Sequence, residues 1–224
     1  MEVESAALTV HAPIFTTDKS LDKLGDFMLR DNFHKNMRSI FAKRNFSPKR
    51  ILDVGCSTGL STLKLFDSFS SAEIIGVDLS PFMLAVGKYE LTTKPNLSIA
   101  KKSVTYMHGA GEDTTLGRGD VDLVSICLVS HELPIKAAKS IFDHAYSILP
   151  SGGALSLMDM NPKSDFFRKF AGNPFAFTAF KSTEPWIQEY ISMDLEKTLE
   201  ESGFEEIEVM SNSPRHRTVV AFKK

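Results

Sequence analysis

The segment ILDVGCSTGLS, residues 51–61, decides the fold that we expect for this chain. A short apolar run carries one acid, a glycine follows, and small residues lead through a second glycine into a stretch with helical spacing. This order is typical of a buried parallel strand, a tight turn and the start of a helix. Glycine permits the sharp turn and a close ligand approach, and the free N–H groups of the first helical turn face the same place. We therefore predict an α/β fold with a ligand site at this turn.

The spacing of the glycines limits what this turn can bind. A dinucleotide-binding loop would read Gly-x-Gly-x-x-Gly, whereas here three residues separate Gly55 from Gly59 and a third glycine is missing. A phosphate-binding loop would place a lysine after its last glycine, and Leu60 stands there. Asp53 adds a carboxylate that suits a cationic or amino-bearing ligand better than a phosphate.

Composition predicts one intracellular α/β domain for the 224 residues. The net charge of −2 and the pI near 6.3 give no reason to expect nucleic acid as a partner. No apolar run approaches the roughly 20 residues of a membrane helix, and the acidic start is unlike a secretory signal. Cys56 and Cys127 indicate a reducing compartment. We expect a cytoplasmic protein, with a plastid protein whose transit peptide has been removed as the alternative.

A second acid follows the next predicted strand, residues 72–78. Asp78 lies about 20 residues beyond Gly59, the distance at which a βαβ unit brings the end of its second strand beside the first loop. A carboxylate there can accept hydrogen bonds from both ribose hydroxyls of an adenosine. Ser80 and Pro81 then supply the N-cap and the first residue of a helix. Met83 on that helix has two open roles, an adenine contact or a plain core residue.

Two further strands bring more residues to the same edge. Residues 104–107 predict a third strand, and residues 121–128 are apolar enough for a central strand buried on both faces. Cys127 and Leu128 end that strand, where their backbone groups can reach the amino-acid part of a cofactor. A fifth strand is predicted at residues 154–160, after an amphipathic helix that starts at Pro134.

Residues 21–44 and the part of the chain after residue 160 depart from the regular alternation of strands and helices. Residues 21–44 predict an amphipathic helical pair in which His34 is a surface or half-buried residue. Residues 161–186 are an insertion rich in phenylalanine, which could form a lid over an apolar substrate or a subsidiary core. Residues 193–202 predict a last helix, followed by two strands at residues 204–210 and 218–222. Strands joined by so short a turn are antiparallel.

From about residue 33 onward these motifs resemble the class I S-adenosylmethionine (SAM) methyltransferases, in the type 11/25 branch of ubiquinone/menaquinone-biosynthesis enzymes. The resemblance implies a Rossmann-like, seven-stranded sheet, mostly parallel with a C-terminal antiparallel hairpin and helices on both faces. That hairpin and the missing third glycine argue against a nicotinamide-dependent oxidoreductase. The family's loop after strand three usually carries an aspartate for the adenine amino group. Ala110 stands there, so Glu112, Asp113 or backbone groups at Ala110 and Gly111 have to take that role.

The resemblance implies SAM as the cofactor, S-adenosylhomocysteine as its product, and a set of residues that bind them: Asp53, Gly55, Cys56, Ser57, Gly59, Asp78, Leu79, Met83, Gly111, Glu112, Cys127 and Leu128. The expected reaction is methyl transfer to an O, N or C nucleophile of a small, partly apolar molecule. The alternative is a catalytically inactive SAM-binding protein that serves as a regulatory or partner subunit. We expect no metal, no nucleic acid, no integral membrane association, and a monomer or homodimer.

His131, directly after strand four, is the candidate catalytic base, because an imidazole can accept a proton at neutral pH. Glu132 could orient it. The competing interpretation is that residues 130–132 only cap the helix that starts at Pro134. As a domain plan, we expect one methyltransferase domain, residues 1–224: an N-terminal helical cap (1–48), a SAM-binding core (49–160), an aromatic lid insertion (161–186), and a last helix with the hairpin (187–224).

Overall fold

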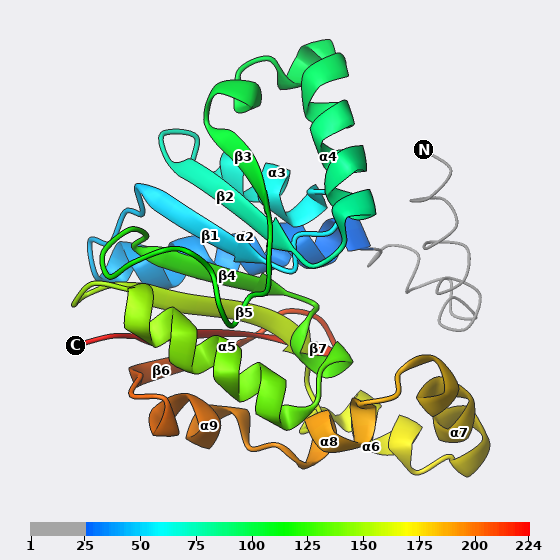
Figure 1. Ribbon diagram of the computed structural model, residues 1–224. Coiled ribbons are helices and arrows are strands. Elements are labelled where there is room, and N and C mark those ends of the chain that lie inside the picture. Colours follow the sequence, from blue (N-terminus) through cyan, green and yellow to red (C-terminus); the bar gives the residue numbers. More distant parts are fainter. Residues whose placement is uncertain (1–25) are drawn as a thin grey trace.

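A seven-stranded sheet forms the centre of the molecule in the computed structural model, which describes residues 26–224 (Figure 1). The strand order is β3-β2-β1-β4-β5-β7-β6, with β1 to β5 parallel and β7 antiparallel to both of its neighbours. This confirms the predicted mostly parallel sheet with a C-terminal hairpin. The strands are β1 Arg50–Val54, β2 Glu73–Asp78, β3 Val104–His108, β4 Leu123–Cys127, β5 Ala154–Met160, β6 Glu205–Ser211 and β7 His216–Phe222.

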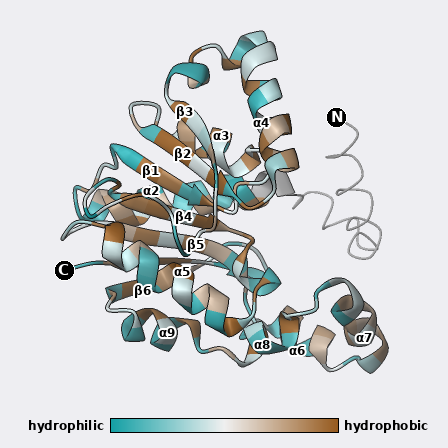
Figure 2. Cartoon of the chain, viewed as in Figure 1, coloured by the Kyte–Doolittle hydropathy of each residue, from teal (hydrophilic) through white to brown (hydrophobic). Residues whose placement is uncertain are grey.

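Helices cover both faces of this sheet, and Figure 1 shows α5 in front of it and α2 behind it. Successive strand residues point to opposite faces, so Leu52 joins the core beneath α5 while Ile51 joins the core beneath α2. Figure 2 shows the hydrophobic colour running through the central strands. The long helices are α2 Asp26–Lys43, α3 Leu60–Ser68, α4 Pro81–Thr93 and α5 Ile135–Ile148, and short 3₁₀ turns occupy Pro95–Leu97, Ala100–Lys102 and Ser130–Glu132 (η4).

The prediction of a helical pair at residues 21–44 is wrong for the described residues of this segment, because they form a single helix, α2, from Asp26 to Lys43. The part before residue 26 lies outside the described residues. The apolar residues Phe33, Met37, Ile40 and Phe41 keep one helical period without a Pro or Gly between them, and all are buried. The expectation for His34 is also wrong, because its ring is buried beside Phe33.

Four short helices follow β5: α6 Asp165–Ala171, α7 Pro174–Thr183, α8 Ile187–Ser192 and α9 Leu195–Glu201. The last helix, predicted at residues 193–202, begins two residues later than expected, at Leu195, because Asp194 accepts a hydrogen bond from the Lys197 N–H and caps α9. Figure 1 shows α7 set apart from the sheet. Among the described helices, none is long and apolar enough to cross a membrane.

Candidate active site

The turn after β1 has the conformation that its glycines predict. Gly55, Ser57 and Gly59 all have positive φ, at 68°, 51° and 91°. The reason for both glycines is close packing against the protein itself. A Cβ on Gly55 would lie 2.6 Å from Cγ2 of Val129, and one on Gly59 would overlap the hydroxyl of Tyr106. The turn is thus packed between Val129, which follows β4, and Tyr106 on β3, before any ligand is considered.

Asp53 is fully buried at the carboxyl end of β1, and its carboxylate is only half satisfied. Oδ2 accepts hydrogen bonds from the hydroxyls of Ser61 at 2.8 Å and Thr62 at 2.7 Å, on the first turn of α3. No donor within the described chain reaches Oδ1. Burial raises the pKa of Asp53 to about 6, against the opposing effect of the two hydroxyls. A buried carboxylate oxygen of this kind favours a cationic donor.

Asp78 ends β2 beside this turn and holds two loops in place. Its Oδ2 accepts from the Ser57 N–H and its Oδ1 from the Ser80 N–H, both at 2.8 Å. Each carboxylate oxygen has a second acceptor position, so hydroxyl groups of a ligand can still bind. Ser80 also caps α4, as predicted. Among the predicted cofactor residues, Leu79 is 67% exposed, and Met83, the possible adenine contact, is half-buried.

Two more loops reach the same edge of the sheet. Gly111, after β3, passes so close to β1 that a Cβ there would lie 2.5 Å from Cγ1 of Val54, while Glu112 beside it is exposed. Cys127 is buried at the end of β4, and Leu128 follows with a φ of 59°. A left-handed conformation is rare for such a side chain and tends to occur at functional sites. Cys56 and Cys127 are both buried.

His131 lies in η4 and is held by an acid that the sequence analysis missed. Its Nδ1 lies 2.6 Å from Oδ1 of Asp159 on β5, and its backbone N–H donates to Oδ2 of the same residue. Because an ionised carboxylate only accepts, Nδ1 carries the proton and Nε2 faces away from Asp159. The edge of the Tyr190 ring packs against the imidazole, and the Tyr190 hydroxyl donates to the Met160 carbonyl.

The alternative role of residues 130–132 as a helix cap is wrong. The N-terminus of α5 has no side-chain cap, and Glu189 on α8 accepts the hydrogen bond from the Ile135 N–H. The expected orienting role of Glu132 is also wrong, because Asp159 takes it. The signal for Asp159 was present in the sequence, because it is the only charged residue in strand β5.

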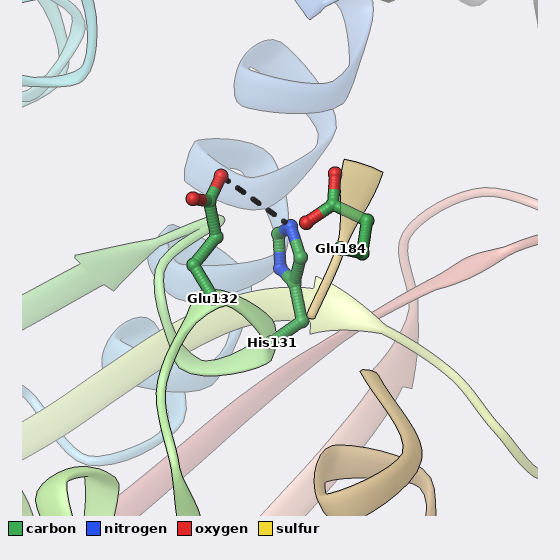
Figure 3. A group of neighbouring side chains, drawn as sticks. All are labelled: His131, Glu132 and Glu184. Carbon is green, nitrogen blue, oxygen red and sulfur yellow. Dashed lines mark ion pairs between the residues drawn. The ribbon is translucent and has the colours of Figure 1, made fainter. Parts of the chain in front are cut away.

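Two glutamates flank the other nitrogen of His131 (Figure 3). Glu132 places Oε1 3.9 Å from Nε2, and Glu184 approaches from the loop between α7 and α8. One side-chain atom from each of the three residues lies within 4.8 Å of the others. Glu184 is buried, whereas the Glu132 side chain is 61% exposed. The sequence offered no spacing signal for Glu184, which lies more than fifty positions away in the aromatic segment (residues 161–186).

The neighbouring carboxylates determine the pKa of His131. Burial alone would lower the pKa of the imidazole, but the charge and hydrogen bond of Asp159, with smaller effects of Glu132 and Glu184, raise it to about 9. The pKa of Asp159 stays below its ordinary value because the His131 interaction outweighs its burial. The pair therefore exists as imidazolium and carboxylate at neutral pH in the ligand-free protein.

Comparisons with known proteins agree with this architecture. Residues 51–153 match the family model described as a methyltransferase domain. An uncharacterized methyltransferase of Synechocystis sp. is 28% identical over 70% of this chain and 66% of its own length. Malonyl-[acyl-carrier protein] O-methyltransferase 1 of Ilyobacter polytropus is 26% identical over 57% of this chain and 44% of its own length. The chain thus spans less than two thirds of each relative.

Among solved structures, a SAM-dependent methyltransferase from Aquifex aeolicus superposes with a TM-score of 0.63. The match covers 92% of this chain and 98% of that one at 16% sequence identity. Likeness at this identity shows the fold alone. The predicted cofactor residues and His131 remain predictions that rest on the geometry given above.

Proposed function

We propose that this chain, a class I SAM-dependent methyltransferase of the type 11/25 kind, transfers the methyl group of SAM to a small, partly apolar molecule. The observation that carries this proposal is the buried carboxylate of Asp53, whose Oδ1 lacks a donor at the head of the turn. SAM offers an ammonium group at its methionine end, which is the donor that this oxygen lacks. The residues present therefore fit the group.

In this proposal, the other predicted residues each bind a different part of the cofactor. Asp78 accepts from the ribose hydroxyls through the acceptor positions that Ser57 and Ser80 leave open. Leu79, Met83 and the loop at Gly111 and Glu112 border the adenine. The backbone at Cys127 and Leu128 faces the amino-acid part, where the left-handed φ of Leu128 aims its carbonyl differently from an extended strand.

For this reaction the protein has to position the acceptor against the methyl group and remove a proton from the acceptor. SAM supplies a methyl group on a sulfonium sulfur, which needs no further activation. Holding nucleophile and methyl group in line contributes roughly 7–11 kcal/mol in well-oriented systems. In the fraction of the protein in which His131 is neutral, its Nε2 accepts the proton of the acceptor, while Asp159 fixes the tautomer and stabilises the imidazolium that forms. Glu184 brings the aromatic segment (residues 161–186) close to His131, which supports the role of that segment as a lid over the acceptor.

Turnover tests this proposal without a known acceptor. The protein, methyl-labelled SAM and a protein-free small-molecule extract are incubated, and label is sought in an organic-soluble product. We expect incorporation by the wild type and at least a hundredfold slower incorporation by His131→Gln, consistent with the 10²–10⁴ range for a catalytic base. A wild type that binds S-adenosylhomocysteine but never transfers label would favour the regulatory alternative and contradict the proposal.

A further inference from the structure

Three large apolar side chains of the aromatic segment are exposed to solvent. Phe175, at the start of α7, is 87% exposed, Trp186 is 40% exposed, and Phe166 on α6 is 37% exposed. Packed rings support them, because the Phe166 ring stacks on that of Phe170, which contacts the Phe177 ring edge-on. Figure 1 shows α7 at the edge of the molecule, away from the sheet. Exposed apolar side chains that gather on one segment mark an interaction surface.

The same part of the chain is basic, although the chain as a whole has a formal net charge of −2. Residues 162–183 contain four basic residues, Lys163, Arg168, Lys169 and Lys181, and one acid, which pairs with Arg168 at the surface. The ammonium of Lys181 lies 5.4 Å from the centre of an aromatic ring, so positive charge and aromatic surface are interleaved. Such a surface attracts an anionic partner within about 10 Å at 0.1 M salt.

We propose that α6, α7 and Trp186 dock this protein on the surface of an anionic lipid bilayer. Phe175 and Trp186 enter the headgroup region, and the lysine and arginine side chains lie at the lipid phosphates. Aromatic side chains combined with basic ones are the pattern by which peripheral proteins bind a bilayer interface. The docking goes beyond the proposed methyl transfer and does not depend on it.

A folded protein partner fits this surface less well. A partner that binds one face of a helix contacts large side chains at positions i, i+3 or i+4, and i+7. On α7 the corresponding exposed residues are Phe175, Thr178, Ala179 and Ser182, and only the first is large and apolar. A bilayer interface imposes no such spacing, because each aromatic side chain enters it separately. These observations favour a lipid surface.

The docking has a consequence for the acceptor, because the same segment reaches the candidate active site. Glu184 is the C-cap residue of α7 and lies in the cluster around His131 (Figure 3). The helix that contacts lipid therefore ends beside the candidate catalytic base. An apolar acceptor dissolved in the bilayer would reach this site along the aromatic segment. This consequence rests on the proposed methyl transfer.

Vesicle binding tests the inference, and Trp186 reports on it because it is the only tryptophan in the chain. The protein is titrated with vesicles of equal parts phosphatidylcholine and phosphatidylserine, and separately with vesicles of phosphatidylcholine alone. We expect saturable binding and a blue shift of the Trp186 emission with the mixed vesicles only. Added salt should release the protein, because salt screens the attraction between the basic side chains and the lipid.

A matched pair of double variants tests the charges. Arg168→Gln combined with Lys169→Gln removes two exposed charges from α6 and should weaken binding to the mixed vesicles about tenfold to thirtyfold. Lys101→Gln combined with Lys102→Gln removes two exposed charges from the turn before β3 and should leave binding unchanged. All four positions are exposed, so both variants should fold.

A second matched pair tests the aromatic contact. Phe175→Ser should weaken binding to the mixed vesicles about tenfold and reduce the blue shift of Trp186. Phe82→Ser removes a phenylalanine that is 83% exposed on α4 and should bind these vesicles as the wild type does.

Several results would overturn the inference. Absence of binding to the mixed vesicles would do so, as would equal weakening by both members of either matched pair. Poly-L-glutamate that shifts the Trp186 emission as strongly as the mixed vesicles would assign the surface to an acidic protein. A dimer that forms without lipid and is broken by Phe175→Ser would assign it to a second copy of the chain. The titration needs neither SAM nor an acceptor, so its failure leaves the proposed methyl transfer intact.

Discussion

Replacing Asp53 with asparagine should change how the stability of the folded protein depends on pH. The carboxyl pKa is raised from 3.8 to about 6 by burial, which corresponds to about 3 kcal/mol at 1.36 kcal/mol per unit. Because the folded-state pKa is the higher one, this contribution to stability is present in full below the unfolded value and is lost as the pH rises through about 6. Asparagine has no such dependence.

The assay is urea unfolding of ligand-free wild type and Asp53→Asn across this range. Between about pH 4.5 and about pH 7.5, the free energy of unfolding of the variant should rise relative to that of the wild type by about 2 kcal/mol. Asp67→Asn, at an exposed position of α3, controls for the loss of one carboxylate. Parallel pH curves for wild type and Asp53→Asn would refute the claim that a buried, half-satisfied carboxylate stands at the turn.

Three further predictions concern the same edge of the sheet. Asp78→Ala should weaken S-adenosylhomocysteine binding at least tenfold in calorimetry, since one charge-assisted hydrogen bond contributes about 1.5–3 kcal/mol; unchanged affinity would contradict its role. The kcat/KM of the wild type should rise with pH up to about 9, because His131 must be neutral to accept a proton, and Asp159→Asn should move this limb to lower pH; an unmoved limb would exclude His131 as the base. Tyr106→Phe should raise the free energy of unfolding by about 1 kcal/mol in urea, because the buried Tyr106 hydroxyl has no hydrogen-bond partner among residues 26–224; a destabilised variant would show that the hydroxyl is satisfied.

Local patterns predicted most of the fold. The turn at residues 51–61, the Ser80 cap of α4 and the C-terminal hairpin each depend on a few neighbouring residues, and each formed as expected. The errors were also local in origin. Asp194 is a cap residue whose signal was present but overlooked, and the single period of α2 contains no break that would support two helices.

The candidate catalytic centre was only half predictable, because long-range packing assembles it. His131 stood out by its place after β4, yet its partner Asp159 lies on the adjacent strand β5 and Glu184 lies beyond two further helices. Sequence spacing does not predict such contacts between residues of different elements. His34 shows the same limit, since its burial depends on how α2 packs and leaves both ring nitrogens without a partner in the described structure.

Calorimetric titration with SAM and S-adenosylhomocysteine, with NADH as the control, tests the central claim most directly. The account predicts binding of both sulfur compounds in the micromolar range, about −8 kcal/mol, no binding of NADH, and clear weakening in Asp53→Asn. Absence of binding to either compound, or wild-type affinity in Asp53→Asn, would contradict the assignment of this turn as the site of the methyl donor.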